Sequence, residues 1–265
     1  MRTFEPSMIG GPWGARLEQR REWIRQLPWN EELPGGPQAL AARLVWTQTA
    51  FSEYASAAAF AEIAAAALRA GAPIDLVAAA GDFVVDELLH TEVAGRIATA
   101  LGGAAAMTVD LEKLVRPPCG SNPLLRAAEL IVRTSCVGES LTVPMLKLSR
   151  GLSGSQLIEA ALRRIVADES SHAQFGWWFL DWADDQLTDE DRAHLSTVAG
   201  DAVGAFAPLL GAGCNESGLG VVACDRYDAV FVDAVRRDVA APLADRGIVI
   251  RHEALSMISS VAQAS

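Results

Sequence analysis

The chain has 265 residues, of which 51% are hydrophobic and 21% are charged, and this is enough apolar material for a proper core. The formal net charge of −11 argues against a nucleic-acid surface, because such a surface needs clustered Lys and Arg. No stretch approaches the roughly 20 consecutive apolar residues of a membrane span, and the N-terminus lacks the basic-then-apolar order of a signal peptide. We therefore expect a cytoplasmic protein with neither a nucleic-acid nor a membrane partner.

The first third of the chain predicts an irregular segment followed by two long helices. Residues 1–36 are rich in Pro, Gly and Trp and predict a strap across the body, with one charged helical stretch near 15–26. Apolar residues then recur at spacings of three and four over 38–70 and 74–101. A Gly-Ala-Pro turn at 71–73 separates the two helices.

The next part predicts a connector and two more long helices. Residues 107–122 form the connector, and Pro123 suits the first position of a helix that runs to about residue 150. Pro144 lies inside this third helix and should kink it. A short glycine-containing turn leads to a fourth helix over 155–185.

The remainder predicts packing helices. Thr188 is placed to cap a fifth helix, and further helical stretches are expected at 227–238 and 251–264, beyond a glycine-rich loop at 209–220. No run is long enough to carry a β-sheet. The prediction is an all-α, single-domain, ferritin-like four-helix bundle with additional terminal helices, divided into a strap (1–36), a metal-binding core (37–185) and packing helices (186–265).

A doubled motif carries the chemistry. The second and fourth helices each contain Asp-Glu-x-x-His, at residues 86–90 and 168–172. Residues three apart share a helix face, so Glu87 with His90, and likewise Glu169 with His172, can reach one metal ion. Carboxylate and imidazole donors suit iron or manganese, whereas thiolate would indicate zinc.

A pair of metal ions also needs a carboxylate from each of the other two helices. Glu139 lies among apolar residues of the third helix. It precedes the turn at 151–154 by about as many residues as Glu169 follows it, so the two should lie at the same level of the bundle. In the first helix Glu53 and Glu62 compete, and the spacing to Glu87 favours Glu53. Glu53 and Glu139 are therefore the expected bridging carboxylates.

The Asp of each motif has a separate expected role. A metal-bound imidazole needs an acceptor for its other N–H, which fixes the tautomer. Asp86 is placed to serve His172 of the opposite helix, and Asp168 to serve His90. The alternative is that both are surface acids, because adjacent helix positions differ in direction by about 100°.

The ligand order resembles the ferritin-like di-iron carboxylate superfamily over residues 40–185. Asp-Glu-x-x-His is similar to its oxygen-activating members, such as bacterial multicomponent monooxygenase hydroxylase subunits and the ribonucleotide reductase small subunit. The resemblance implies two Fe ions (or Mn with Fe), O₂ as co-substrate and a small organic substrate. An external electron donor (a ferredoxin or reductase) is also expected, because the sequence shows no flavin or iron–sulfur module, and we expect a helix-packed homodimer. The resemblance also implies a catalytic role for Thr142, one turn after Glu139; a threonine bonded to its own helix backbone is the alternative.

Departures from that pattern narrow the choice. Ala94 stands where the reductase subunit has its radical tyrosine, and Ile165 stands where arylamine N-oxygenases have an extra histidine. The four cysteines form no Cys-x-x-Cys pair, so their spacing predicts free thiols and neither a zinc nor a rubredoxin-type site. His194 and His252 have no carboxylate at ligand spacing and are expected to be ordinary.

The sequence thus predicts a non-haem di-iron oxygenase or oxidase. Hydroxylation, N-oxygenation, desaturation and C–C cleavage all remain open, because they differ in where the substrate lies. One alternative is a ferroxidase or iron-handling protein without an organic substrate. The other is a non-catalytic helical bundle.

Overall fold

The computed structural model describes residues 1–8, 10–206, 218–222 and 224–251. The described part is all-α apart from one pair of two-residue strands, so the all-α part of the fold prediction is confirmed. The stretch expected to be helical at 251–264 and most of the loop at 209–220 lie outside the described residues. Within the described part, no helix combines the length and the hydropathy needed to cross a membrane.

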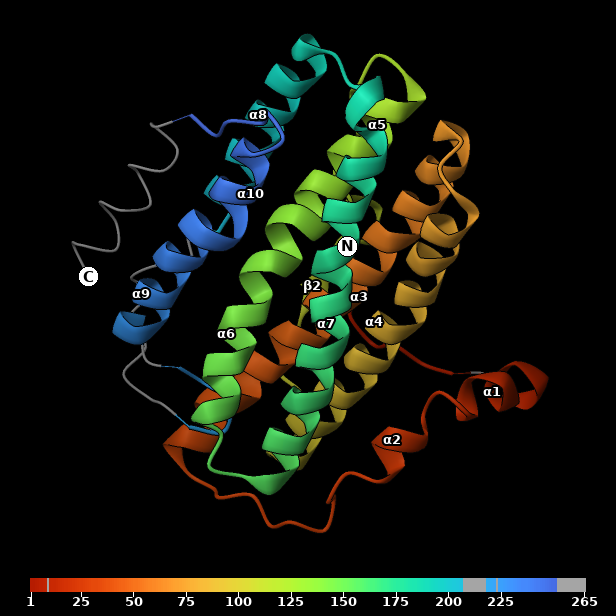
Figure 1. Ribbon diagram of the computed structural model, residues 1–265. Helices are drawn as coiled ribbons and strands as arrows, with labels where there is room; N and C mark the ends of the chain where they lie inside the picture. Colours follow the sequence, from red (N-terminus) through yellow and green to blue (C-terminus); the bar gives the residue numbers. More distant parts are fainter. Residues whose placement is uncertain (9, 207–217, 223, 252–265) are drawn as a thin grey trace.

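Four long helical rods lie side by side (Figure 1). They are α3 (Pro37–Ala70), α4 (Ile74–Ala100), the continuous run α5 (Pro123–Ile131), η2 (Val132–Glu139) and α6 (Ser140–Gly151), and α7 (Gln156–Ala183). α3 and α4 form a hairpin, and α6 and α7 form a second one.

The ends of these helices follow from local chemistry. α3 begins with Pro37 and is capped after Ala70 by Gly71, whose φ of 69° is the left-handed conformation that glycine adopts freely. Asn122 caps α5 by accepting a hydrogen bond from the Leu125 amide, and Ser155 caps α7 through the Ile158 amide.

The third rod differs from the single α-helix that the sequence predicts. Its middle, η2, is a π-helix, and Glu139 is the last residue of that segment. Pro144 lies inside α6, as expected. α7 packs closely against η2, because a Cβ atom on Gly176 would lie 2.7 Å from the Cys136 sulfur. This approach sets the distance between the rods that carry Glu139 and Glu169.

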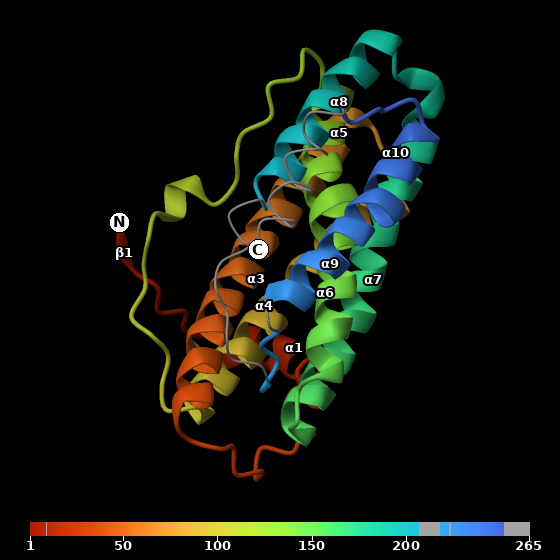
Figure 2. The same ribbon diagram turned by 90° about the vertical axis from the view of Figure 1, so that its left-hand side faces the viewer.

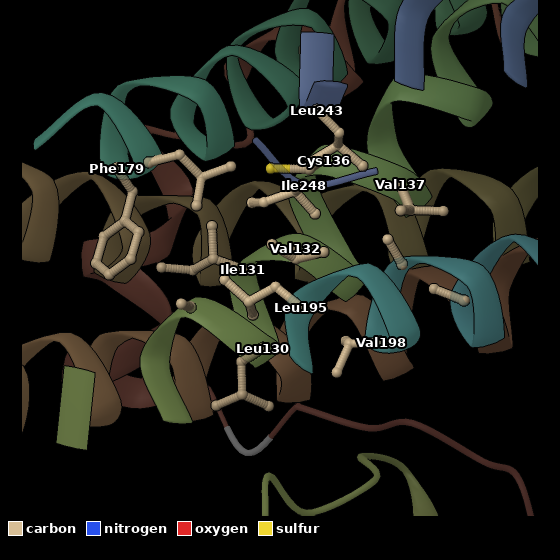
Figure 3. Packing of buried hydrophobic residues seen from close by; sticks show 14 of the residues in the cluster. Leu130, Ile131, Val132, Cys136, Val137, Phe179, Leu195, Val198, Leu243 and Ile248 are labelled. Carbon is tan, nitrogen blue, oxygen red and sulfur yellow. The ribbon is translucent and has the colours of Figure 1, made fainter. Parts of the chain in front are cut away.

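The C-terminal helices cover the outer face of the third rod. α8 (Asp189–Gly204) packs on η2 and begins with a capping box between Thr188 and Asp191. The run α9 (Cys224–Ala234), η5 (Val235–Ala240) and α10 (Ala241–Ala244) lies along α6 and is longer than predicted. Figure 3 shows the apolar core between these layers, with side chains from η2, α7, α8, α10 and the segment after α10: Val132, Cys136, Phe179, Leu195, Val198, Leu243 and Ile248.

The strap contains two short helices, α1 (Gly11–Glu18) and α2 (Glu22–Arg25), instead of one helical stretch. Arg21 fastens it to α4 through two hydrogen bonds to Glu92, of 2.8 and 2.5 Å. Strand β1 (Arg2–Thr3) pairs antiparallel with β2 (Thr108–Val109), which the sequence did not predict.

The connector between the second and third rods runs along the outside of the bundle (Figure 2). It contains β2 and the short helix η1 (Leu111–Lys113). A second short helix, η3 (Asp184–Gln186), links α7 to α8.

Candidate metal centre

The six residues predicted as metal ligands all lie inside the bundle. None has more than 8% of its surface exposed: Glu53, Glu87, His90, Glu139, Glu169 and His172. α3, α4, η2 and α7 each supply at least one of them. Glu62, the competing residue on α3, is exposed, so burial favours Glu53.

One half of the cluster surrounds His90. Its Nδ1 atom lies 3.0 Å from a Glu169 oxygen, and 3.7 Å from an oxygen of both Glu53 and Glu87. One donor atom from each of these four residues lies within 4.8 Å of the others. This buried group could therefore hold a metal ion.

The other half surrounds His172. Its Nδ1 atom lies 2.9 Å from Glu87 Oε1 and 2.8 Å from Glu169 Oε2. Glu139 interacts electrostatically with these same three residues. Glu87 and Glu169 therefore approach both histidines, whereas Glu53 belongs with His90. The expectation that Glu53 and Glu139 would be the bridging carboxylates does not fit this geometry, in which Glu87 and Glu169 are the shared ones.

The outer nitrogens of the two histidines face the aspartates of the opposite helix, as the motif predicted. His90 Nε2 lies 3.2 Å from Asp168 Oδ2, which is a hydrogen bond. His172 Nε2 lies 3.8 Å from Asp86 Oδ2, which is an ion-pair distance but too long for a hydrogen bond. Only 13% and 11% of these carboxylate side chains are exposed, so neither is an ordinary surface acid.

Two arginines hold these aspartates, and sequence reasoning missed both. Arg164 donates a 2.8 Å hydrogen bond to Asp168 from one turn earlier on α7. Arg20, in the strap, donates a 2.7 Å hydrogen bond to Asp86. The spacing of Arg164 and Asp168, four apart on a helix, could have revealed the first pair. No local signal reveals the second, because 66 positions separate its members.

Electrostatics in the cluster favour protonated histidines. Burial alone lowers the pKa of an imidazole, but the surrounding carboxylates outweigh it. Asp86, Glu169 and Glu87 raise the pKa of His172 to about 12. The pKa of His90 is likewise raised well above its usual range, chiefly by Asp168 and Glu169.

The carboxylates divide into two kinds. Burial, together with the charges of Glu87 and Glu169, raises the pKa of Glu53 and of Glu139 well above the usual range. Burial acts on Glu169 as well, but its hydrogen bond with His172 and the nearby His90 ring hold its pKa well below the usual range. Without a cation, the cluster therefore keeps protons that it would release to a metal ion.

Unpartnered polar atoms test whether a metal fits. Both Glu87 oxygens and His90 Nδ1 are buried and make no hydrogen bond within the described structure, although ring nitrogens lie near the carboxylate. A buried polar group without a partner costs about 1–3 kcal/mol. A cation between the shared carboxylates would satisfy these atoms together, so the residues present fit a metal.

A cavity of about 70 Å³ adjoins Glu53. Its walls come from α3, α6, α7 and the turn at 218–221, and the side chains that form them are mostly apolar: Val45, Trp46, Leu146, Leu162 and Ile165, with Thr49 and Ser149. The turn is fixed above it, because Trp46 donates a 2.9 Å hydrogen bond to the Leu219 carbonyl. Thr142 is half-buried in α6, and among the contacts of the described residues none joins it to the cluster.

A second group of side chains that could hold a metal ion lies outside this centre. The expectation that His194 would be ordinary was wrong, because its Nε2 atom lies 2.7 Å from the buried Glu129 carboxylate. The Cys119 sulfur lies 3.8 Å from the same Glu129 oxygen. Sequence spacing missed the group because its members come from three separate segments. His252 lies outside the described residues.

No protein-family model, no curated protein and no solved structure matches this chain. The functional argument therefore depends on the residues and their geometry.

Proposed function

We propose that this chain is a non-haem di-iron oxygenase or oxidase of the ferritin-like type, which oxidises a small organic substrate with O₂. The observation that carries the proposal is the pairing of two histidine-containing halves across two shared, buried carboxylates. Four carboxylates and two imidazoles, without a thiolate, form a donor set that suits two iron ions, or manganese with iron.

The ligands would be Glu53, Glu87, His90, Glu139, Glu169 and His172. Bound iron would supply the oxidising chemistry, with electrons from a ferredoxin or reductase. The chain orients the donors: Asp168 accepts from His90 Nε2, which leaves Nδ1 directed inward. Phe60 and Phe83 pack on the His172 ring, at centroid distances of 5.1 and 4.3 Å, and exclude water from it.

The cavity favours an organic substrate over iron handling. A route for hydrated iron needs polar or acidic walls, whereas most of the side chains that line this cavity are apolar. Its volume suits O₂ and the reacting end of a small molecule beside Glu53.

The test is iron binding followed by oxygen uptake. Protein purified without added metal is reduced, loaded with Fe²⁺ under anaerobic conditions and desalted. We expect about two irons per chain, and faster O₂ consumption, with product formed, when a matching compound from a panel of small apolar organic molecules is added with a reductase. Leu146→Trp, which narrows the cavity, should keep the iron and lose substrate oxidation.

Two results would overturn the proposal. Protein that retains no iron would remove the metal centre. Iron that accumulates as mineral far beyond two per chain, with Leu146→Trp behaving as wild type, would establish iron handling instead.

A further inference from the structure

A mixed cluster of Cys119, Glu129 and His194 lies where the connector meets α5 and α8. His194 Nε2 is 2.7 Å and Cys119 Sγ is 3.8 Å from the same Glu129 oxygen, Oε1. All three donor atoms lie within 4.8 Å of one another. The side chain of Glu129 is fully buried, that of His194 is 34% exposed, and Cys119 is exposed.

The cluster is held in place by contacts that do not depend on a ligand. The Cys119 amide donates a 2.9 Å hydrogen bond to Glu129 Oε2. Arg126 donates a 2.8 Å hydrogen bond to the Gly120 carbonyl, and Arg133 one of 2.7 Å to the Arg116 carbonyl. These bonds hold the connector on both sides of the cysteine, so its sulfur is presented in a fixed position.

Glycine at position 120 is what allows the connector to come so close. A Cβ atom there would lie 2.8 Å from Leu125 Cγ and 2.9 Å from the Arg126 amide nitrogen. It would also lie 3.0 Å from Glu129 Oε1, the oxygen that both other donors approach. The lack of a side chain at position 120 therefore lets the connector pack directly against the Glu129 carboxylate.

We propose that Cys119, Glu129 and His194 form a second metal site, which binds Zn²⁺ or a similar thiophilic divalent cation. Tetrahedral Zn²⁺, with bonds of about 2.3 Å to sulfur and about 2.0–2.2 Å to nitrogen and oxygen, keeps its ligand atoms roughly 3.3–3.6 Å apart. The two measured separations from the Glu129 oxygen lie on either side of that range. Three protein ligands and a solvent-facing side leave the fourth position to water.

The order of the three groups favours a metal over a nucleophilic cysteine. A Cys–His nucleophile needs its imidazole between thiol and carboxylate, so that the ring removes the thiol proton. Here the carboxylate oxygen approaches both other groups, and the histidine uses Nε2 toward that oxygen. A thiolate ligand also distinguishes this site from the thiolate-free cluster of Glu53 to His172.

The test uses Co²⁺, whose bonds to thiolate give a near-ultraviolet charge-transfer band that carboxylate and imidazole ligands cannot give. Metal-free, full-length protein is titrated with Co²⁺, and Zn²⁺ affinity is then measured by displacement of that band. We expect the band in wild type and in Cys136→Ala, which changes a buried core thiol. Cys119→Ser should abolish it, and His194→Gln should weaken Co²⁺ binding by more than about tenfold.

The proposal is independent of the di-iron function, because the band reports only thiolate coordination. A wild-type band that persists in Cys119→Ser, or no band at all, would overturn it. Unchanged Co²⁺ affinity in His194→Gln would also overturn it. Circular dichroism of each variant checks that the fold is intact, which the exposure of Cys119 and the partial exposure of His194 lead us to expect.

Discussion

Single residues decide whether the buried cluster binds metal, and His172 offers the clearest case. The ring is fully buried and its Nδ1 atom lies within 3 Å of both shared carboxylates. We expect His172→Ala to at least halve the iron retained per chain after anaerobic loading. His194→Ala is the matched control, because that histidine lies in the other cluster, and it should retain the wild-type amount. Elemental analysis of desalted protein makes the measurement, and equal iron in all three proteins would exclude the ligand set.

For single residues, the sequence predicts most of the candidate metal ligands. It misses contacts between residues that lie far apart in the chain. Glu87 with His90 and Glu169 with His172 follow from the three-residue helical spacing alone. Spacing alone only favours Glu53 over Glu62 as the ligand from α3. The structure supports that choice, because Glu53 is buried and Glu62 is exposed. The contact of Arg20 with Asp86 and that of His194 with Glu129 join segments far apart in the chain, and no periodicity encodes such pairs.

Among the elements, the π-helix η2 makes the sharpest prediction, because Gly176 of α7 lies against it. A Cβ atom at Gly176 would lie 2.7 Å from Cys136 Sγ and 2.8 Å from Ser135 Cβ. Gly176→Ala should therefore push α7 from η2 and lower the free energy of unfolding by about 1–3 kcal/mol. It should also reduce iron retention, since Glu139 and Glu169 would move apart.

Gly81→Ala is the control for that substitution. Gly81 is an exposed residue of α4 and a Cβ atom there meets nothing within 4 Å. The change should raise the free energy of unfolding by about 0.5–1 kcal/mol, because alanine favours the helix. Urea unfolding measures the free energy of unfolding of both variants. An equal change in this free energy at the two positions would contradict the close approach of α7 to η2 at Gly176.

The strap is a second element whose role can be tested. Arg21 makes two hydrogen bonds to Glu92, and the two side chains are only 15% and 13% exposed. Arg96 also contacts Glu92, so that carboxylate keeps a partner when Arg21 is removed. We expect Arg21→Ala to cost about 1 kcal/mol and to speed proteolysis within residues 1–36. Arg237→Ala, whose ion pairs are exposed, should change neither quantity, and equal cleavage rates would show that Arg21 does not fasten the strap.

The sequence predicts helix ends where a residue strongly favours the start of a helix. It does not predict whether a segment is an α-helix or a π-helix. Pro37, Pro123, Ser155 and Thr188 each stand at the start of a helix, as their chemistry requires. The π-helical segment uses residues that would equally suit an α-helix, so its form depends on packing against α7 and α8. Strands β1 and β2 have two residues each and lie far apart in the chain. Strands this short show no alternation of apolar and polar residues that would predict them.

For the whole molecule, the protons kept by the cluster make the stability of the metal-free protein depend on pH. Folding raises the pKa of His172 from an unfolded value of about 6.5 to about 12, and that of His90 in the same direction. The stabilisation is complete below the unfolded pKa and is lost as the pH rises toward the folded one. The raised pKa of Glu53 and of Glu139 acts in the same direction. Glu169, with its lowered pKa, loses its contribution only in acid and is constant here.

The free energy of unfolding of chelator-treated protein should therefore fall between pH 6.5 and 9, by about 1.4 kcal/mol per pH unit for each proton retained. Urea titrations at several pH values measure it. His172→Gln, which cannot hold that proton, should show a shallower slope. Iron-loaded protein should lose the slope, because a bound cation replaces the protons, and for the same reason iron affinity should rise with pH. A metal-free protein whose stability is constant or rises over this interval would contradict the protonated cluster.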